Sequence, residues 1–203
     1  MKATMIAIDQ RQIRRSEEQL TERCRQGDLD AFGQVYMLYE RNVYRYAFYL
    51  LGHSEDAADV KQETFIKAYQ AIGTFRGNSS LLTWLLKICI NLCRDRLRTR
   101  KSHYLLYEHI TRETLDGGTS AQDPYACAER SQTIATILRG LQGLSPAQRE
   151  IIILRDIEGL EYGEIARALG CTAPTAKMRL HRARHSLKER VISLMEAREE
   201  PCE

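Results

Sequence analysis

Apolar residues recur at three- and four-residue spacing along most of this chain, and this helical period is the feature that most constrains its fold. Between Leu29 and Leu51 the apolar positions are Phe32, Val35, Tyr36, Tyr39, Val43, Tyr46, Ala47 and Leu50. Such spacing places them on one face of an amphipathic helix. Sustained period-two alternation does not occur, and no Asn-Gly or Asp-Gly turn separates two β-branched runs. The sequence therefore predicts an all-α fold.

Three helices are expected in the first part of the chain. Gly52 ends the helix that begins at Leu29, since a left-handed glycine commonly follows a helix. Ser54 is expected to cap the next helix, which runs to about Ile72. Its inward positions are Ala57, Ala58, Phe65, Ile66 and Tyr69. After a turn at residues 76–80, an apolar helix extends from Leu81 to Leu97.

Periodicity is lost between residues 102 and 122, where glycines, Ser, Thr and several acids gather. This composition is typical of a solvated tether. The interpretation is two small helical domains, at residues 16–101 and 128–197, joined by a flexible linker at 102–127. We expect the two domains to behave independently in the free protein, and the linker to be cleaved readily by proteases.

The second domain contains a helix-turn-helix pattern. Ser145 and Pro146 suit the cap and first position of a helix. Two further helices, Tyr162–Leu169 and about 173–195, follow, and the turn between them contains Gly170. A recognition helix needs side chains near its N-terminus that reach base edges in the major groove. The outward side chains here are Thr175, Lys177, Met178, Arg179, His181 and Arg182. The alternative is a helical hairpin that packs against protein.

Basic residues gather in two blocks, although the net charge of +3 is too small to indicate nucleic-acid binding by itself. The blocks lie at residues 87–101 and 177–190, and each has one opposing acid. A single block of this kind is usually a solvated helix face. Two blocks, each at the end of a predicted helical unit, favour phosphate contact instead.

Six cysteines are scattered without a CxxC pair, which argues against a zinc ribbon and against a secreted disulfide framework. Cys89 and Cys93 lie one helical turn apart, as do His181 and His185, but two ligands are too few for a metal site. The sequence has no phosphate loop and no nucleophile elbow. We expect neither metal nor cofactor, and no catalysis.

No apolar run approaches the ~20 residues that cross a bilayer, and the first residues lack the pattern of a signal peptide. The expectation is a cytoplasmic protein without stable membrane insertion.

Two long stretches resemble one family. The stretch SPAQREIIILRDIEGLEYGEIARALGCTAPTAKMRLHRARHSLKE resembles the sigma-4 domain of extracytoplasmic-function (ECF) sigma factors, with its QRE start, its EGLSYEEIA-like core and its TVKSRLHRAR-like recognition helix. Upstream, SEDAADVKQETFIKAYQAIGTFRGNSSLLTWLLKICINLCRDRLR is similar to the sigma-2 domain. The two stretches cover most of residues 20–192 in the family's order. The resemblance implies a non-enzymatic subunit that binds core RNA polymerase, directs it to promoters and often has an anti-sigma partner.

The resemblance also implies site residues. The helix with the D-x-x-QE-x-F pattern would face the polymerase through Asp56, Asp59, Gln62 and Glu63. The turn and helix that follow resemble the reader of the −10 element, where one base of the non-template strand is flipped out. Its side chains here are Arg76, Asn78, Ser79, Ser80, Asn91, Arg94, Asp95 and Arg98. The outward residues of the helix-turn-helix would read the −35 duplex. Trp84 is expected in the core.

Three positions depart from the family pattern. Lys61 stands where relatives carry an aliphatic residue, and it is expected to alter the polymerase-facing surface. Pro174 replaces a glycine and Met178 replaces a serine, so the resemblance implies DNA contact by the recognition helix but does not imply its base preference. Two alternatives from other classes are a free-standing regulator that dimerises on operators and an adaptor that binds only protein. Neither needs a polymerase-binding helix followed by a single-strand reader.

Overall fold

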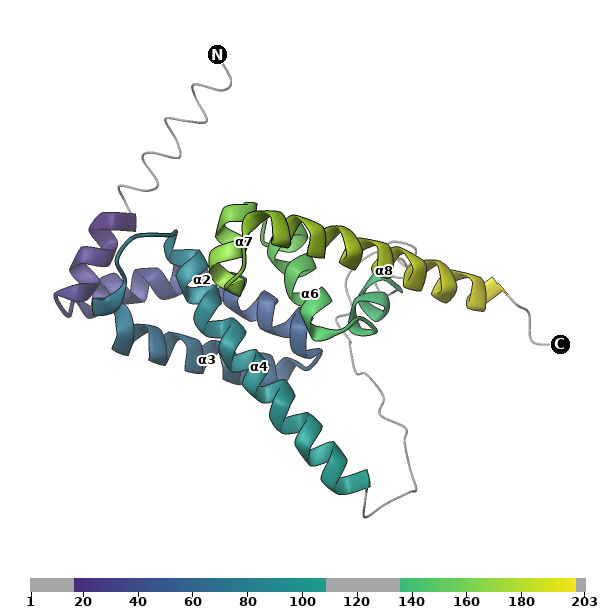
Figure 1. The fold of residues 1–203 in the computed structure, drawn as a ribbon. Coiled ribbons are helices and arrows are strands. Elements are labelled where there is room, and N and C mark those ends of the chain that lie inside the picture. Colours follow the sequence, from purple (N-terminus) through teal and green to yellow (C-terminus); the bar gives the residue numbers. More distant parts are fainter. Residues whose placement is uncertain (1–16, 109–135, 200–203) are drawn as a thin grey trace.

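The computed structural model describes residues 17–108 and 136–199, and every element in these ranges is helical (Figure 1). The all-α prediction is confirmed. A helix at residues 17–25 comes first, and the elements after it are α2 (Leu29–Leu51), α3 (Ser54–Ala71), the 3₁₀ turn η1 (Ile72–Thr74) and α4 (Leu81–Glu108). A helix at 136–142 opens the second part. It is followed by α6 (Pro146–Ile152), the π-helical turn η2 (Ile153–Ile157), α7 (Tyr162–Leu169) and α8 (Ala173–Glu199).

In the N-terminal half, residues 17–108, helices α2, α3 and α4 pack on one another around a shared apolar core (Figure 1). Tyr46 and Leu85 are fully buried, and the rings of Tyr36 and Phe65 lie 4.7 Å apart. Asp28 caps α2 by accepting a hydrogen bond of 3.0 Å from the backbone N–H of Ala31. The predicted end of this helix is confirmed, because Gly52 has a left-handed φ of 77°.

In the C-terminal half, residues 136–199, helices α6 and α7 pack against α8. Leu154, Ile165 and Leu180 are almost completely buried between them. The predicted start of α6 is confirmed, since Ser145 and Gln148 form a reciprocal capping box with Pro146 at the first turn. The helix-turn-helix also begins and ends at the predicted residues, apart from the longer C-terminal end of α8.

Three sequence-based expectations in the N-terminal half are wrong. Helix α4 continues to Glu108, beyond the expected end at Leu97 and into the predicted linker, because residues 98–108 contain neither glycine nor proline and include good helix formers. The cap position of α3 is His53 rather than Ser54, and His53 makes no side-chain capping bond. Two of the predicted inward side chains of α3 are exposed, since Ile66 retains 58% and Tyr69 42% of its surface. The remainder of the predicted linker and residues 128–135 lie outside the described ranges.

The two halves touch, contrary to the expectation of independent domains. Helix α2 contacts α6, and α4 contacts α7. One buried apolar cluster includes Leu50 and Cys89 from the N-terminal half together with Leu154 and Ile165 from the C-terminal half. Polar contacts add to it, since the Gln142 amide donates to the Tyr49 carbonyl at 2.9 Å. The sequence pattern did not reveal this interface because it joins residues far apart in the chain.

Across residues 17–108 and 136–199, no helix has the length and apolar character needed to span a membrane.

Candidate nucleic-acid interface

The helix-turn-helix is held by its turn residues. Gly170 has a left-handed φ of 67°, and the N–H groups of Gly170 and Cys171 both donate to the Ala166 carbonyl. Thr172 caps α8 as predicted, because its hydroxyl accepts a hydrogen bond of 3.3 Å from the N–H of Thr175. On the inner face of α8, Ala176, Leu180 and Ala183 are buried. The opposite face of α8 is thereby turned to solvent.

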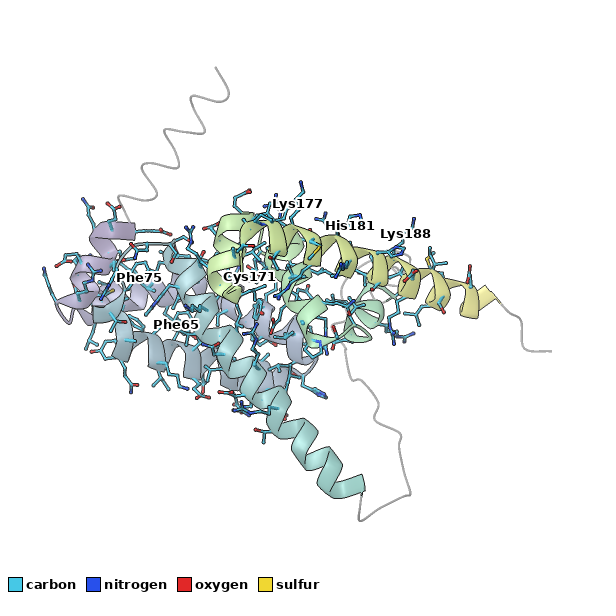
Figure 2. All side chains as sticks on the ribbon, in the orientation of Figure 1. Phe65, Phe75, Cys171, Lys177, His181 and Lys188 are labelled. Carbon is cyan, nitrogen blue, oxygen red and sulfur yellow. The ribbon has the colours of Figure 1, made fainter. Side chains whose placement is uncertain are left out.

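That outer face carries most of the predicted duplex-reading residues. The exposed members are Lys177, Met178, Arg179, His181 and Arg182. In Figure 2, Lys177 and His181 lie along the outer side of α8, away from the other helices. Thr175 differs, since it is half-buried and its hydroxyl lies 2.8 Å from that of Thr172. The surface therefore offers four cationic or imidazole side chains and one exposed thioether between residues 177 and 182, which suits phosphates and apolar base edges.

The predicted single-strand residues lie along α4 and the turn before it. Arg76 and Asn78 are exposed in the turn, and Ser79 and Ser80 are half-buried. Asn91 lies ten residues beyond Leu81, roughly 15 Å along the helix axis at 1.5 Å per residue. The structure thus brings these residues into an extended track rather than into one cluster.

The far part of this track has two exposed polar side chains on one helix face. Asn91 and Asp95 lie one turn apart and are both exposed. Arg98 donates to Asp95 at 3.0 Å in a surface ion pair, which is an interaction of small net energy. Trp84 is half-buried against the ring of Phe75 at 5.3 Å, in keeping with the expected core role.

Two of the predicted single-strand residues are bound by the C-terminal half. Arg94 forms two hydrogen bonds of 2.7 Å with the carboxylate of Glu150, and these bonds raise the pKa of the Arg94 guanidinium. Ser80 donates to the carboxylate of Glu164 on α7 at 3.0 Å. Sequence reasoning missed both acids. No local pattern marks them, because their partners lie in the other half of the chain.

The predicted polymerase-facing residues lie on α3 and are mostly accessible. Gln62 is exposed, and the Asp59 side chain retains 61% of its surface. Glu63 is half-exposed and pairs with Lys67 at 3.1 Å. Arg96 of α4 lies 3.5 Å from Asp59 and 3.6 Å from Asp56, distances of loose surface pairs. Asp56 is the least exposed of the four, at 21%.

Lys61, the residue expected to alter this surface, contacts α2. Its ammonium lies 5.8 Å from the centre of the Tyr36 ring and 6.0 Å from that of Tyr44, both on α2. It also lies 4.0 Å from a carboxylate oxygen of Glu40. The lysine therefore joins α3 to α2, and its side chain is only 21% exposed.

Two family models match the chain. Sigma-70 region 2 matches residues 35–103, and Sigma-70, region 4, matches residues 134–187. The RNA polymerase sigma-H factor of Pseudomonas aeruginosa is 32% identical over 184 residues, which cover 88% of this chain and 95% of that protein. The ECF RNA polymerase sigma factor SigW of Bacillus subtilis is 31% identical over 178 residues, with 84% and 94% covered.

Solved structures agree with these matches. The sigma factor RpoE of Bartonella quintana, in complex with the anti-sigma factor NepR, is similar with a TM-score of 0.66 and 27% identity, covering 80% of this chain and 98% of that one. CnrH, in complex with the cytosolic domain of CnrY, has a TM-score of 0.64 and 25% identity, covering 89% and 97%.

Proposed function

Because this chain belongs to the ECF sigma factors of the sigma-70 family, we propose that its two halves divide promoter recognition between the residues described above. The protein directs RNA polymerase to promoters and starts transcription, which is what defines this family. The proposal concerns which side chains do so. It assigns polymerase contact to α3, the −10 strand to α4 and its preceding turn, and the −35 duplex to α8.

The outer face of α8 docks on the −35 duplex. Lys177, Arg179 and Arg182 neutralise phosphates, which supplies affinity and orientation but little sequence information. His181 and the exposed Met178 lie between them and reach base edges, where the apolar thioether suits a thymine methyl group. Thr175 supports the start of the helix, since its N–H and hydroxyl are both engaged by Thr172.

The track along α4 holds the −10 non-template strand once the duplex has begun to open. A flipped base needs hydrogen bonds to its edge that offset a few kcal/mol of lost stacking. Asn78, Ser79 and Ser80 in the turn, with Asn91 and Asp95 further along, supply these polar groups. Arg76, Arg94 and Arg98 hold phosphates of the displaced strand.

The exposed face of α3 binds the polymerase. Asp56, Asp59, Gln62 and Glu63 offer oxygen acceptors to basic side chains of the partner, and hydrogen bonds between ionised groups are the stronger kind.

We also propose that an anti-sigma factor regulates the protein. The basis is that the similar RpoE was solved with one. The protein acts in the cytoplasm and by binding alone, without catalysing a reaction.

One observation carries the assignment: a single chain combines an exposed acidic helix, a polar single-strand track and an exposed basic recognition helix. An operator-binding regulator needs only the last of these. Run-off transcription with core polymerase on a library of random promoters tests the function directly. The expected result is initiation at promoters that share two motifs. Initiation that never exceeds that of core polymerase alone would contradict the proposal.

A further inference from the structure

Residues 75–80 form the loop between η1 and α4, and this loop carries two exposed side chains proposed to meet the −10 strand, Arg76 and Asn78. In its middle, Gly77 has a left-handed φ of 71°, a conformation that other residues rarely adopt. A loop that selects a base must hold its polar groups in place, because a hydrogen bond weakens steeply once its angle departs from the optimum. Groups that fix this loop therefore affect recognition without touching DNA.

Both ends of the loop are fixed by contacts within the N-terminal half. At its end, the Ser80 hydroxyl accepts a hydrogen bond of 3.2 Å from the N–H of Thr83 at the start of α4. At its start, the side chain of Phe75 is buried, and the centre of its ring lies 5.3 Å from that of Trp84. The N–H of Phe75 donates to the carbonyl of Ile72 at 3.1 Å. The exposed part of the loop begins from this fixed backbone position.

The carbonyl of Phe75 (Figure 2) accepts its hydrogen bond from a side chain 50 positions earlier. The donor is Nη2 of Arg25, the last residue of the helix at 17–25. The same guanidinium lies 3.1 Å from a carboxylate oxygen of Glu22, one turn earlier, and this pair orients it. A hydrogen bond from a charged donor is stronger than one between neutral groups. Arg25 thus joins the loop to the helix at 17–25.

The helix at 17–25 is itself held against the rest of the N-terminal half. Its inner side chains Leu20 and Cys24 are buried in the apolar core. At its first residue, the carboxylate of Glu17 accepts a hydrogen bond from the Tyr39 hydroxyl on α2. The helix is therefore tied to α2 at its start and to the loop at its end. It forms a support on which the position of the loop depends.

We propose that Arg25 is a positioning residue for −10 recognition, which holds the Phe75 carbonyl and thereby the loop that presents Arg76 and Asn78 to the strand. This inference rests on the proposed function of that loop. Arg25 acts through the backbone and needs no contact with DNA. Without it the loop samples several conformations, of which only a fraction suits the preferred base. Apparent affinity for that base falls with this fraction, whereas phosphate contacts, which carry no sequence information, are retained.

The test uses the full chain assembled with core polymerase and two promoters that share one −35 element. One promoter has the preferred −10 sequence found by run-off transcription, and the other has one substituted −10 base. The ratio of their opening, measured by permanganate reactivity, is the −10 selectivity. Arg25→Ala should lower this ratio about fivefold, as it would if the suitable fraction fell from nearly one to about one fifth. Arg25→Lys keeps a charged donor and should restore part of the selectivity.

The matched control is Arg23→Ala, which removes the same charge from the same helix. The Arg23 side chain is 49% exposed and pairs with Asp28 at 2.8 Å rather than with the loop. Its selectivity should equal that of wild type. Hydrogen exchange in the free protein gives a second readout, because a locally released segment exchanges faster while the remainder stays protected. Exchange of the amides at 76–80 should be faster in Arg25→Ala, and exchange in α2 should be unchanged.

Selectivity that is unchanged in Arg25→Ala, or lost equally in Arg23→Ala, would overturn the inference. An equal loss of opening on both promoters, with faster exchange in α2 as well, would also overturn it, since that is the result of a purely structural role.

The double variant Asn78→Ala with Ser79→Ala tests the loop itself. If this variant lowers the selectivity and Arg25→Ala does not, the positioning role is wrong and the proposed function of the loop stands. If the double variant leaves the selectivity unchanged, the loop does not read the −10 strand, and the proposed function of the loop fails together with the inference.

Discussion

Arg149 of the C-terminal half donates a hydrogen bond of 2.7 Å from its Nη1 to the backbone carbonyl of Leu50 in the last turn of α2. That turn has no basic residue of its own. A cation from the other half thus meets the negative end of the helix dipole, an arrangement that stabilises helices. The same nitrogen donates to Gln142 at 2.5 Å, and burial lowers the pKa of the guanidinium. The helix end and α6 are thereby joined.

Removing this side chain should destabilise the whole protein. Arg149→Ala leaves the Leu50 carbonyl and the Gln142 amide oxygen without this donor, at an expected cost of about 1–3 kcal/mol. The exposed Arg139→Ala in the same half should stay within about 0.5 kcal/mol of wild type. Urea unfolding monitored by circular dichroism measures both, and the midpoint should fall at unchanged slope. Equal midpoints for the two variants would mean that the halves are not joined at this place in solution.

The sequence predicted local features well because their causes are local. Gly52, Ser145 and Thr172 each act on a helix end within a few residues, so the sequence around them is sufficient. The exposed face of α8 follows from helical period alone. Arg182 and Lys177 are therefore found outside, as expected.

The contacts between the halves could not be predicted in the same way. Glu158 precedes a glycine and has the local sequence pattern of a solvated acid, yet its side chain has no exposed surface and accepts a hydrogen bond from Arg45, which lies 113 positions earlier. Whether a charged side chain is exposed or paired depends on tertiary structure, which the local pattern of charges does not contain. The same reason explains why Arg94 was assigned to DNA without its partner Glu150.

Polymerase binding should depend on the charge of α3. Asp59→Arg with Glu63→Arg replaces two acceptors by cations facing the partner's basic groups, and affinity for core polymerase should fall about tenfold or more, or about 1.4 kcal/mol. The fold should persist, since both side chains make only surface ion pairs. Co-purification and fluorescence titration with core polymerase provide the measurement.

The matched control for that prediction is Glu18→Arg with Glu22→Arg, an equal charge change on the exposed side of the helix at 17–25. It should bind core polymerase as wild type does. Undiminished binding by the α3 variant, or an equal loss in the control, would show that the acidic face of α3 is not the contact.

Duplex binding should be strongly dependent on salt. Each phosphate neutralised by the protein releases counterions and contributes about 0.9 to the slope of log K against log salt. Arg182→Ala should weaken binding to a −35 duplex and reduce that slope by about 0.9. Arg139→Ala removes the same charge from an exposed site on the helix at 136–142 rather than on α8, and it should leave the slope unchanged. If the affinity for the −35 duplex depended neither on the salt concentration nor on Arg182, the alternative of an adaptor that binds only protein would be favoured.

Promoter opening should fail separately from promoter docking when the single-strand track is altered. Asn91 is exposed on α4 and makes its proposed contact only after the duplex has begun to open. Asn91→Ala removes an amide that both donates and accepts, and the loss of its contact to an extruded base should cost about 1–3 kcal/mol. The holoenzyme should still assemble and still protect the −35 element from nuclease. Permanganate reactivity of thymines near the start site should fall, and abortive transcripts with it.

A template with a pre-melted bubble isolates the step, because it removes the need to open the duplex. On this template Asn91→Ala should recover part of its activity, whereas Arg182→Ala, which affects docking, should gain less. Gln26→Ala removes an exposed amide from the turn after the helix at 17–25 and should open duplex templates as wild type does. If Asn91→Ala and Asn78→Ala both opened duplex promoters normally, the strand would have to be held elsewhere. The exposed face of α4 would then have no role in melting, and Asp95 and Arg98 would be no more than a surface ion pair.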